Sequence, residues 1–193
     1  MTDALTWREA RQDDVPAFVA LVESAYRGDD SRAGWTTEAD LLGGQRMDEA
    51  MGRELLEAPG TLVLLFWRGE GAAALTTDGT TAGTPANPIA CVQIEDTGES
   101  TAYFGTFAVS PTLQGGGIGS LVMAAAEQAA EERWGATRMR MTVIRQRTEL
   151  IGYYERRGYA LTGESEPFPY GQEQFGLPQR ADLEFVVLEK PLG

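Results

Sequence analysis

The sequence contains no histidine, a single cysteine (Cys91) and a single lysine (Lys190) among its 193 residues. Without histidine, the chain cannot build a serine–histidine–aspartate triad, a histidine-ligated metal site or an imidazole acid–base catalyst. A single cysteine excludes an internal disulfide and fits a reducing cytoplasm. Proton transfer must therefore use carboxylates, tyrosines, Cys91, Lys190, the termini, the backbone or water.

Long apolar runs are also missing. No run approaches the ~18 apolar residues of a membrane-spanning helix. The N-terminus lacks the basic segment and the apolar segment of a signal peptide. We therefore expect a cytoplasmic protein. Cys91 stands in an apolar, strand-like run, so buried packing explains it better than reactivity does.

Positive charge is scarce. The chain has 16 lysines and arginines against 29 acidic residues, which gives a formal net charge of −13. Such a field repels nucleic acid and anionic membranes, which we exclude as partners. It could attract cationic substrates such as amines. Solubility alone is the simpler explanation of the charge.

What the chain does contain is enough apolar material for a substantial core, 42% of its residues. Its length suits one domain, spanning residues 1–193. Residues 69–88, which are rich in Gly, Thr, Ala and Pro, predict an exposed loop or a mobile hairpin connection. Strands are expected at 4–10, 61–67, 89–95, 103–109, 138–144, from 159, and at 182–189. Helices are expected at 15–26, 36–42, 45–58, 118–134 and 148–157.

This order of elements predicts the α/β class, with one mixed central sheet of about six to seven strands flanked by helices. The sequence between the first two helices, Gly28-Asp29-Asp30-Ser31, is expected to break helical structure. The second helix would then begin at a cap on Thr36 or Thr37.

The most informative segment is residues 109–120, Val-Ser-Pro-Thr-Leu-Gln-Gly-Gly-Gly-Ile-Gly-Ser, between a predicted strand and a predicted helix. Such a turn presents backbone N–H groups at the positive end of a helix dipole, which suits a phosphate. The spacing excludes a dinucleotide fingerprint, whose third glycine falls on Ser120, and a phosphate-binding Walker loop, which needs a lysine. The alternative is a glycine-rich turn that merely caps a helix.

The pattern Gln114-x-x-Gly117-x-Gly119, which follows Val109 and Pro111, resembles the pyrophosphate loop of the GNAT superfamily of acetyl-CoA-dependent N-acetyltransferases. A second GNAT element, Phe/Leu-Tyr-x-x-x-Gly-Phe/Tyr, is matched further along the chain by Tyr153, Tyr154, Gly158 and Tyr159. The resemblance is close over residues 103–160 and loose elsewhere. It implies a single-domain GNAT fold whose two central strands splay at the acetyl-CoA site.

The resemblance also implies acetyl-CoA as co-substrate, with no metal. It places the pantetheine arm against the backbone of Phe107 and Val109. The pyrophosphate would lie against the glycine loop, which comprises Gln114, Gly115, Gly116, Gly117, Ile118, Gly119 and Ser120.

The chemistry of acetyl transfer needs a proton donor. An amine attacks the thioester carbonyl, an oxyanion forms and coenzyme A leaves as a thiolate, which a phenol of pKa ~10 can protonate. The resemblance assigns this role to Tyr154, and a backbone N–H near Val109 to the oxyanion. The alternative is a tyrosine that packs its ring in the core and directs its hydroxyl to water.

Three arginines and the general base remain unassigned. Many relatives carry an asparagine seven residues before the tyrosine, but this chain has Arg147, which could pair with the cofactor's 3′-phosphate or lie on the helix surface. The same question arises for Arg156 and Arg157. No general base is named, although several carboxylates could approach the site, namely those of Glu95, Glu99, Glu155, Asp182 and Glu184.

The acceptor is expected to be a primary amine of a small molecule or peptide, between the first two helices and the last strands. Tyr26, Trp35 and Glu38 are the candidate acceptor residues, since aromatics with an acid suit a cation. Thr36, Phe168 and Tyr170 could join them, and Trp35 could instead anchor a loop. The alternative function is a non-catalytic acyl-CoA-binding sensor or interaction module on the same fold. A homodimer is expected only by analogy with the family.

Overall fold

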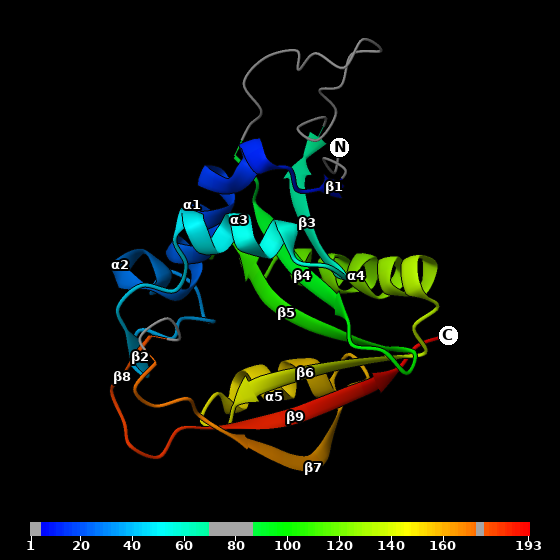
Figure 1. Cartoon of the computed structure of the whole chain (residues 1–193). Coiled ribbons are helices and arrows are strands. Elements are labelled where there is room, and N and C mark those ends of the chain that lie inside the picture. Colours follow the sequence, from blue (N-terminus) through cyan, green and yellow to red (C-terminus); the bar gives the residue numbers. More distant parts are fainter. Residues whose placement is uncertain (1–4, 70–86, 173–175) are drawn as a thin grey trace.

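The computed structural model describes residues 5–69, 87–172 and 176–193. Nearly all of the segment 69–88, expected to form an exposed connection, lies outside the described residues. The strands of the main sheet are β1 (Leu5–Glu9), β3 (Thr61–Arg68), β4 (Ala90–Asp96), β5 (Thr101–Val109), β6 (Arg138–Ile144), β7 (Ala160–Pro167) and β9 (Glu184–Pro191). They form one mixed sheet of seven strands in the order β1-β3-β4-β5-β6-β9-β7 (Figure 1). This confirms the predicted α/β class and the predicted sheet.

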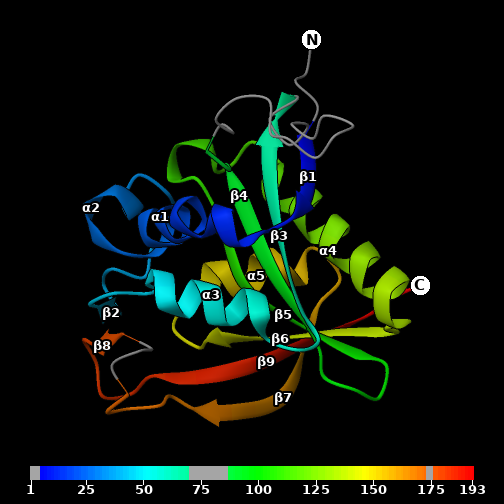
Figure 2. The same cartoon turned by 45° about the horizontal axis from the view of Figure 1, so that its top comes forward.

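Helices cover both faces of this sheet (Figure 2). One face packs against α1 (Val15–Tyr26) and α3 (Glu49–Glu57), and the other against α4 (Ile118–Trp134) and α5 (Thr148–Glu155). Short 3-10 turns at Gln12–Asp14 and Pro111–Leu113 precede α1 and α4. None of these helices, nor the short helix α2 (Gly28–Ser31), is long and apolar enough to cross a membrane, within the residues the structure describes.

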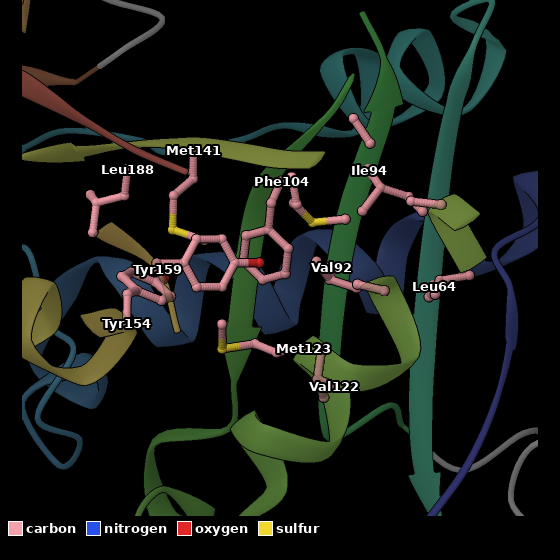
Figure 3. Packing of buried hydrophobic residues seen from close by; sticks show 14 of the residues in the cluster. Leu64, Val92, Ile94, Phe104, Val122, Met123, Met141, Tyr154, Tyr159 and Leu188 are labelled. Carbon is pink, nitrogen blue, oxygen red and sulfur yellow. The ribbon is translucent and has the colours of Figure 1, made fainter. Parts of the chain in front are cut away.

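The continuous apolar run of β3 reflects burial on both sides of the sheet. Leu64 and Phe66 join the core beneath α4 and α5, whereas Leu65 and Trp67 join the core beneath α1 and α3. Successive strand residues point to opposite faces, so a strand covered twice needs apolar residues throughout. Figure 3 shows the first core, where Leu64 and Val122 lie at one end and Tyr154 and Tyr159 at the other.

The two central strands diverge. β5 and β6 are parallel and pair only through Thr101–Tyr103 and Arg138–Arg140, after which they separate (Figure 1). In the part of β5 beyond Tyr103, the register with β4 shifts between Gly105 and Ala108, and Thr106 has a φ of 39°. This bulge bends the strand away from β6. The predicted splay is therefore confirmed.

One predicted helix is wrong. Residues 36–42 form turns leading into a short strand, β2 (Leu42–Gly43), which pairs with β8 (Leu177–Pro178). The helix that follows α1 is instead α2, in the segment expected to break helical structure. The Thr37 hydroxyl lies 2.6 Å from the Ser31 hydroxyl and accepts from the Ala39 N–H at 3.1 Å, as a helix cap would. Only one turn follows, in which the N–H groups of Leu41 and Leu42 donate to the Glu38 carbonyl before the chain enters β2.

The helix predicted over 45–58 begins later, at Glu49. The Asp48 carboxylate accepts a hydrogen bond from the Met51 N–H at 2.8 Å, which caps the helix at that point. Pairing between β2 and β8 could not be predicted, because each strand has two residues and the two lie far apart in the sequence.

Candidate active site

A cavity of about 690 Å³ opens where β5 and β6 diverge. The C-terminal end of α1, the segment 35–46, both strands, the glycine loop and α5 contribute to its wall. The predicted site residues that line it are Tyr26, Trp35, Glu38, Phe107, Val109, Gln114, Gly115, Gly117, Gly119 and Tyr154. Gly116, Ile118 and Ser120 lie in the loop but outside the lining.

The glycine loop presents unpaired backbone donors. Gly115 and Gly117 both have a φ of 83°, and Gly117 is the N-cap of α4, without a side-chain cap. Within the described part of the chain, no acceptor is recorded for the N–H groups of residues 115–119. The first turn of α4 carries no acidic side chain. These N–H groups and the helix dipole make an anion site.

Gln114 joins this loop to the segment that follows α2. Its Oε1 accepts from the backbone N–H groups of Trp35 at 2.9 Å and Thr36 at 3.3 Å. Its Nε2 donates to the Thr36 hydroxyl at 2.8 Å and to the Val109 carbonyl at 3.1 Å. The side chain is therefore engaged with protein groups, and its expected contact with the cofactor would have to come from its backbone. Gly34 leaves room for it, since a Cβ there would lie 2.5 Å from Oε1.

The close approach of Tyr153 on α5 leaves no room for a side chain at Gly119. A Cβ at this position would overlap the Tyr153 hydroxyl and lie 3.3 Å from the Phe107 ring. The guanidinium of Arg157 lies 3.4 Å from the Tyr153 ring centroid, and its Nε and Nη2 donate to the Ser120 hydroxyl at 3.0 and 2.8 Å. Arg157, which the sequence left unassigned, is therefore a fixed cation beside the glycine loop.

Tyr154 lies on α5, with only 5% of its surface exposed. Its ring makes edge contacts with Phe104, Tyr153 and Tyr159. Burial raises the pKa of the Tyr154 phenol well above its ordinary value near 10. The side chain lines the cavity as a neutral donor at physiological pH.

Tyr26, at the end of α1, contacts the bulged part of β5. Its hydroxyl donates to the Phe107 carbonyl at 2.5 Å. Burial, and then the charge of Glu38, raise the pKa of Tyr26 to about 12. The Phe107 and Val109 carbonyls thus each accept a hydrogen bond from a side chain, and a carbonyl oxygen can accept two hydrogen bonds.

Glu38 is buried between two arginines. Its carboxylate accepts from Arg27 Nη1 at 2.7 Å and from Arg147 Nη1 at 2.8 Å. Burial alone would raise the pKa of the Glu38 carboxyl, but the charges of Arg147 and Arg27 outweigh it and lower the pKa. Both oxygens already have cationic partners, which argues against Glu38 as the recognition group for a substrate ammonium. Arg147 is a partner of Glu38 and not a free surface arginine.

The aromatic residues predicted for the acceptor site, apart from Tyr26, lie in two different places. Trp35 lies 5.3 Å, between ring centroids, from Tyr153 and so stands beside the glycine loop. Phe168 is buried in a small cluster with Leu42 and Leu183, and neither it nor Tyr170 lines the cavity. The carboxylates considered as bases, Glu95, Glu99, Glu155, Asp182 and Glu184, also lie outside the lining.

Cys91 is buried on β4, as its sequence context predicted. Burial raises the pKa of its thiol to about 12, so it carries no thiolate at neutral pH.

The comparisons with known proteins agree with this geometry. A family model described as "Acetyltransferase (GNAT) family" matches residues 45–159. A search of curated protein sequences finds no match. Among solved structures, the ribosomal-protein-S18-alanine N-acetyltransferase from Escherichia coli is 13% identical with a TM-score of 0.63, over 98% of this chain and 95% of that one. Nourseothricin acetyltransferase is 17% identical with a TM-score of 0.63, and the match covers 98% of this chain and 99% of that one. The IAA acetyltransferase from Bacillus cereus ATCC 14579 is 12% identical with a TM-score of 0.61, and the match covers 98% of this chain and 100% of that one.

Proposed function

The chain belongs to the acetyltransferase (GNAT) family, and we propose that it transfers the acetyl group of acetyl-CoA to a primary amine of a small molecule or peptide. One observation carries the proposal. The glycine loop, whose residues 115–119 have no recorded acceptor for their N–H groups within the described chain, contributes Gly115, Gly117 and Gly119 to the wall of the cavity that Tyr154 also lines. An anion site and a neutral proton donor thus share one cavity, as transfer from a phosphate-bearing thioester requires.

The residues present fit acetyl-CoA. The loop N–H groups and Arg157 supply donors and positive charge for its pyrophosphate. The gap between β5 and β6 leaves one edge of β5 without a strand partner beyond Tyr103. An extended amide chain such as pantetheine could add to that edge as a further strand does, by backbone hydrogen bonds. Phe107 and Val109 stand on this part of β5.

The proposed transfer is direct. The amine nitrogen attacks the thioester carbonyl carbon, forming the C–N bond and placing the negative charge on oxygen. A backbone N–H near Val109 would hold this oxyanion. The C–S bond then breaks, the sulfur takes one proton and the nitrogen loses one, so that the products are the acetylated amine and coenzyme A. Cys91 forms no covalent intermediate in this scheme, because it is buried as a thiol.

Tyr154 is proposed to stabilise the leaving sulfur by donating a hydrogen bond to it. Its raised pKa keeps the phenol protonated, so it can donate a hydrogen bond to the sulfur as negative charge builds there. Edge contacts with Phe104, Tyr153 and Tyr159 hold the Tyr154 ring in the cavity wall. These three solved structures share the fold at 12–17% identity, so the substrates in their names do not identify the acceptor here.

The first test separates cofactor binding from turnover. Coenzyme A should raise the melting temperature, because a ligand that binds only the folded state stabilises it. Thiol release should follow when acetyl-CoA is mixed with a panel of amines, amino acids, aminoglycosides, polyamines and peptides.

Tyr154→Phe tests the assigned proton donor. We expect kcat to fall at least tenfold, since a positioned acid contributes ~10²-fold or more. The melting-temperature shift with coenzyme A should stay close to that of the wild type. Tyr170→Phe, on an exposed ring outside the cavity, is the matched control. Unchanged turnover in Tyr154→Phe would remove Tyr154 from the mechanism.

A non-catalytic acyl-CoA sensor is the second candidate. It predicts stabilisation by coenzyme A with no thiol release for any amine. An interaction module built on the fold predicts neither. The presence of Tyr154 in the cavity wall favours the enzyme over both.

A further inference from the structure

The acceptor end of the cavity contains an arginine without an ion-pair partner in the described residues, although the whole chain is strongly acidic. Arg46 lines the cavity, with its guanidinium carbon 5.5 Å from the Tyr26 ring centroid. Its side chain is half-buried. Among the residues that the structure describes, this guanidinium has no recorded hydrogen bond and no ion pair. A cation in a cavity wall without a counter-ion is a candidate binding group for an anion.

The charges around Arg46 do not balance it. The buried Glu38 carboxylate is shared between Arg27 and Arg147. The Glu23 carboxylate accepts from the backbone N–H groups of Arg46 and Met47, both at 2.6 Å, and forms no ion pair with the Arg46 guanidinium within the described residues. Arg27 is itself buried, and its Nε and Nη2 have no partner in the described residues. Arg46 is thus a cation without an ion-pair partner in the described part of a chain whose net charge is −13.

Arg46 makes no recorded contact with the glycine loop within the described residues, whereas Arg147 donates to the carbonyl of Thr36, whose hydroxyl accepts from Gln114. Arg46 acts electrostatically on Tyr26, on Glu38 and on Cys91, all on the α1 side of β5. The cation that contacts the loop is Arg157, through Ser120 and Tyr153. Two arginines thus serve two ends of the cavity, and Arg46 is not needed for a pyrophosphate bound at the loop.

We propose that the acceptor amine carries a carboxylate, and that Arg46 binds this carboxylate. The inference rests on the proposed function and names the class of its acceptor: an amino acid, or a peptide presenting a carboxylate near its amine. A guanidinium matches a carboxylate by two parallel N–H···O bonds, and partial burial strengthens them. Glu166, which faces the cavity from β7 and has no cation partner among the described residues, provides an attractive site for the ammonium end.

The test uses matched acceptors that differ only at the carboxylate. Thiol release is measured with acetyl-CoA and each of several amino acids and dipeptides, alongside its C-terminal amide. We expect kcat/KM at least tenfold higher for the free carboxylate with the best pair. Arg46→Gln should bring that ratio close to one, and Arg46→Lys should retain part of it. Arg53→Gln is the control, because Arg53 is exposed on α3 and pairs with Glu49 outside the cavity.

Each result decides between the two proposals. Equal or faster transfer to the amides in the wild type overturns the carboxylate inference and leaves the proposed function intact. Transfer to no amine overturns both, and stabilisation by coenzyme A then separates a sensor from an interaction module. If Arg46→Gln does not fold, competition decides: carboxylic acids without an amine should inhibit the wild type against the acceptor, and their amides should not. Equal inhibition by both would overturn the inference.

Discussion

At the scale of single residues, the site depends on buried polar groups whose partners come from distant parts of the chain. Arg147 reaches Glu38 across 109 positions in the sequence, and Tyr26 reaches the Phe107 carbonyl across 81. Tyr154 stands among aromatic rings and keeps its proton. Each of these groups has a testable consequence for rate or for stability.

The raised pKa of Tyr154 predicts the alkaline side of the pH profile. A phenol with a raised pKa in the folded protein stays protonated until the pH exceeds that raised value, which lies above the ordinary ~10. We therefore expect kcat at saturating substrates to show no loss between pH 8 and pH 10 that depends on Tyr154. A rate that falls with a midpoint near pH 9, in the wild type and not in Tyr154→Phe, would contradict this.

Glu38→Gln should destabilise the protein. The substitution leaves buried Arg27 and part-buried Arg147 without their counter-ion, and removing one partner of a buried pair costs about 3–5 kcal/mol. Denaturant unfolding measures the difference. Glu49→Gln breaks an exposed pair with Arg53 and should cost about 0.5 kcal/mol or less. Equal losses of unfolding free energy in the two variants would show that the buried Glu38 ion pairs stabilise the protein no more than an exposed pair does.

The pH dependence of stability follows the same pair. The folded-state pKa of Glu38 lies below its ordinary value of 4.5. Its contribution is therefore fully present above that value and is lost as the pH falls through the lowered pKa. The stability difference between the wild type and Glu38→Gln should shrink below pH 4.5. A difference that stays constant from pH 7 down to the acid transition would contradict the ion-pair account.

At the scale of elements, the glycine loop and α5 are held as one unit. Gln114 ties the loop to Trp35 and Thr36, and Arg157 ties the first turn of α4 to α5 through Ser120. The loop therefore presents its N–H groups on a rigid frame. A pre-organised anion site loses less entropy on binding than a mobile one.

Gly119→Ala tests this frame. The added Cβ would overlap the Tyr153 hydroxyl, so α5 or the loop must shift. We expect coenzyme A affinity, measured by calorimetry, to fall about tenfold, which corresponds to about 1.4 kcal/mol. Gly119→Ala combined with Tyr153→Phe removes the overlapping hydroxyl and should recover most of the affinity. A double variant as weak as the single one would show that Gly119 acts through another contact.

The elements differ in how far the sequence predicts them. The run 61–67 and the helix after Gly117 carry strong local patterns, and both were predicted near their observed bounds. The helix predicted at 36–42 is wrong, because only one turn follows the capping bond to the Thr37 hydroxyl, and the chain then pairs as β2 with the distant strand β8. The partnership of Arg147 with Glu38 and the role of Arg157 beside the loop had no local signal. They depend on long-range contacts that only the folded structure brings together.

At the scale of the whole molecule, one sheet connects all parts of the site. Strands from both ends of the chain, β1 and β9, belong to it, and the cavity lies at its divergent centre. We propose that residues 1–193 form a single acetyltransferase domain.

A single domain should unfold in one cooperative step. Differential scanning calorimetry should give one transition with equal calorimetric and van't Hoff enthalpies. Coenzyme A should move the whole transition upward, since the cavity proposed to bind it is lined by both β5 and β6. Two resolved transitions, only one of which responds to coenzyme A, would contradict a single domain.

The most direct test of the central claim is the product balance of one reaction. The protein is mixed with acetyl-CoA and a panel of primary amines, and acetylated amine and free coenzyme A are quantified together by mass spectrometry and thiol assay. The account predicts that both products appear in equal amounts with at least one amine, and that Tyr154→Phe slows both alike. Stabilisation by coenzyme A with no acetylated product from any amine would contradict it.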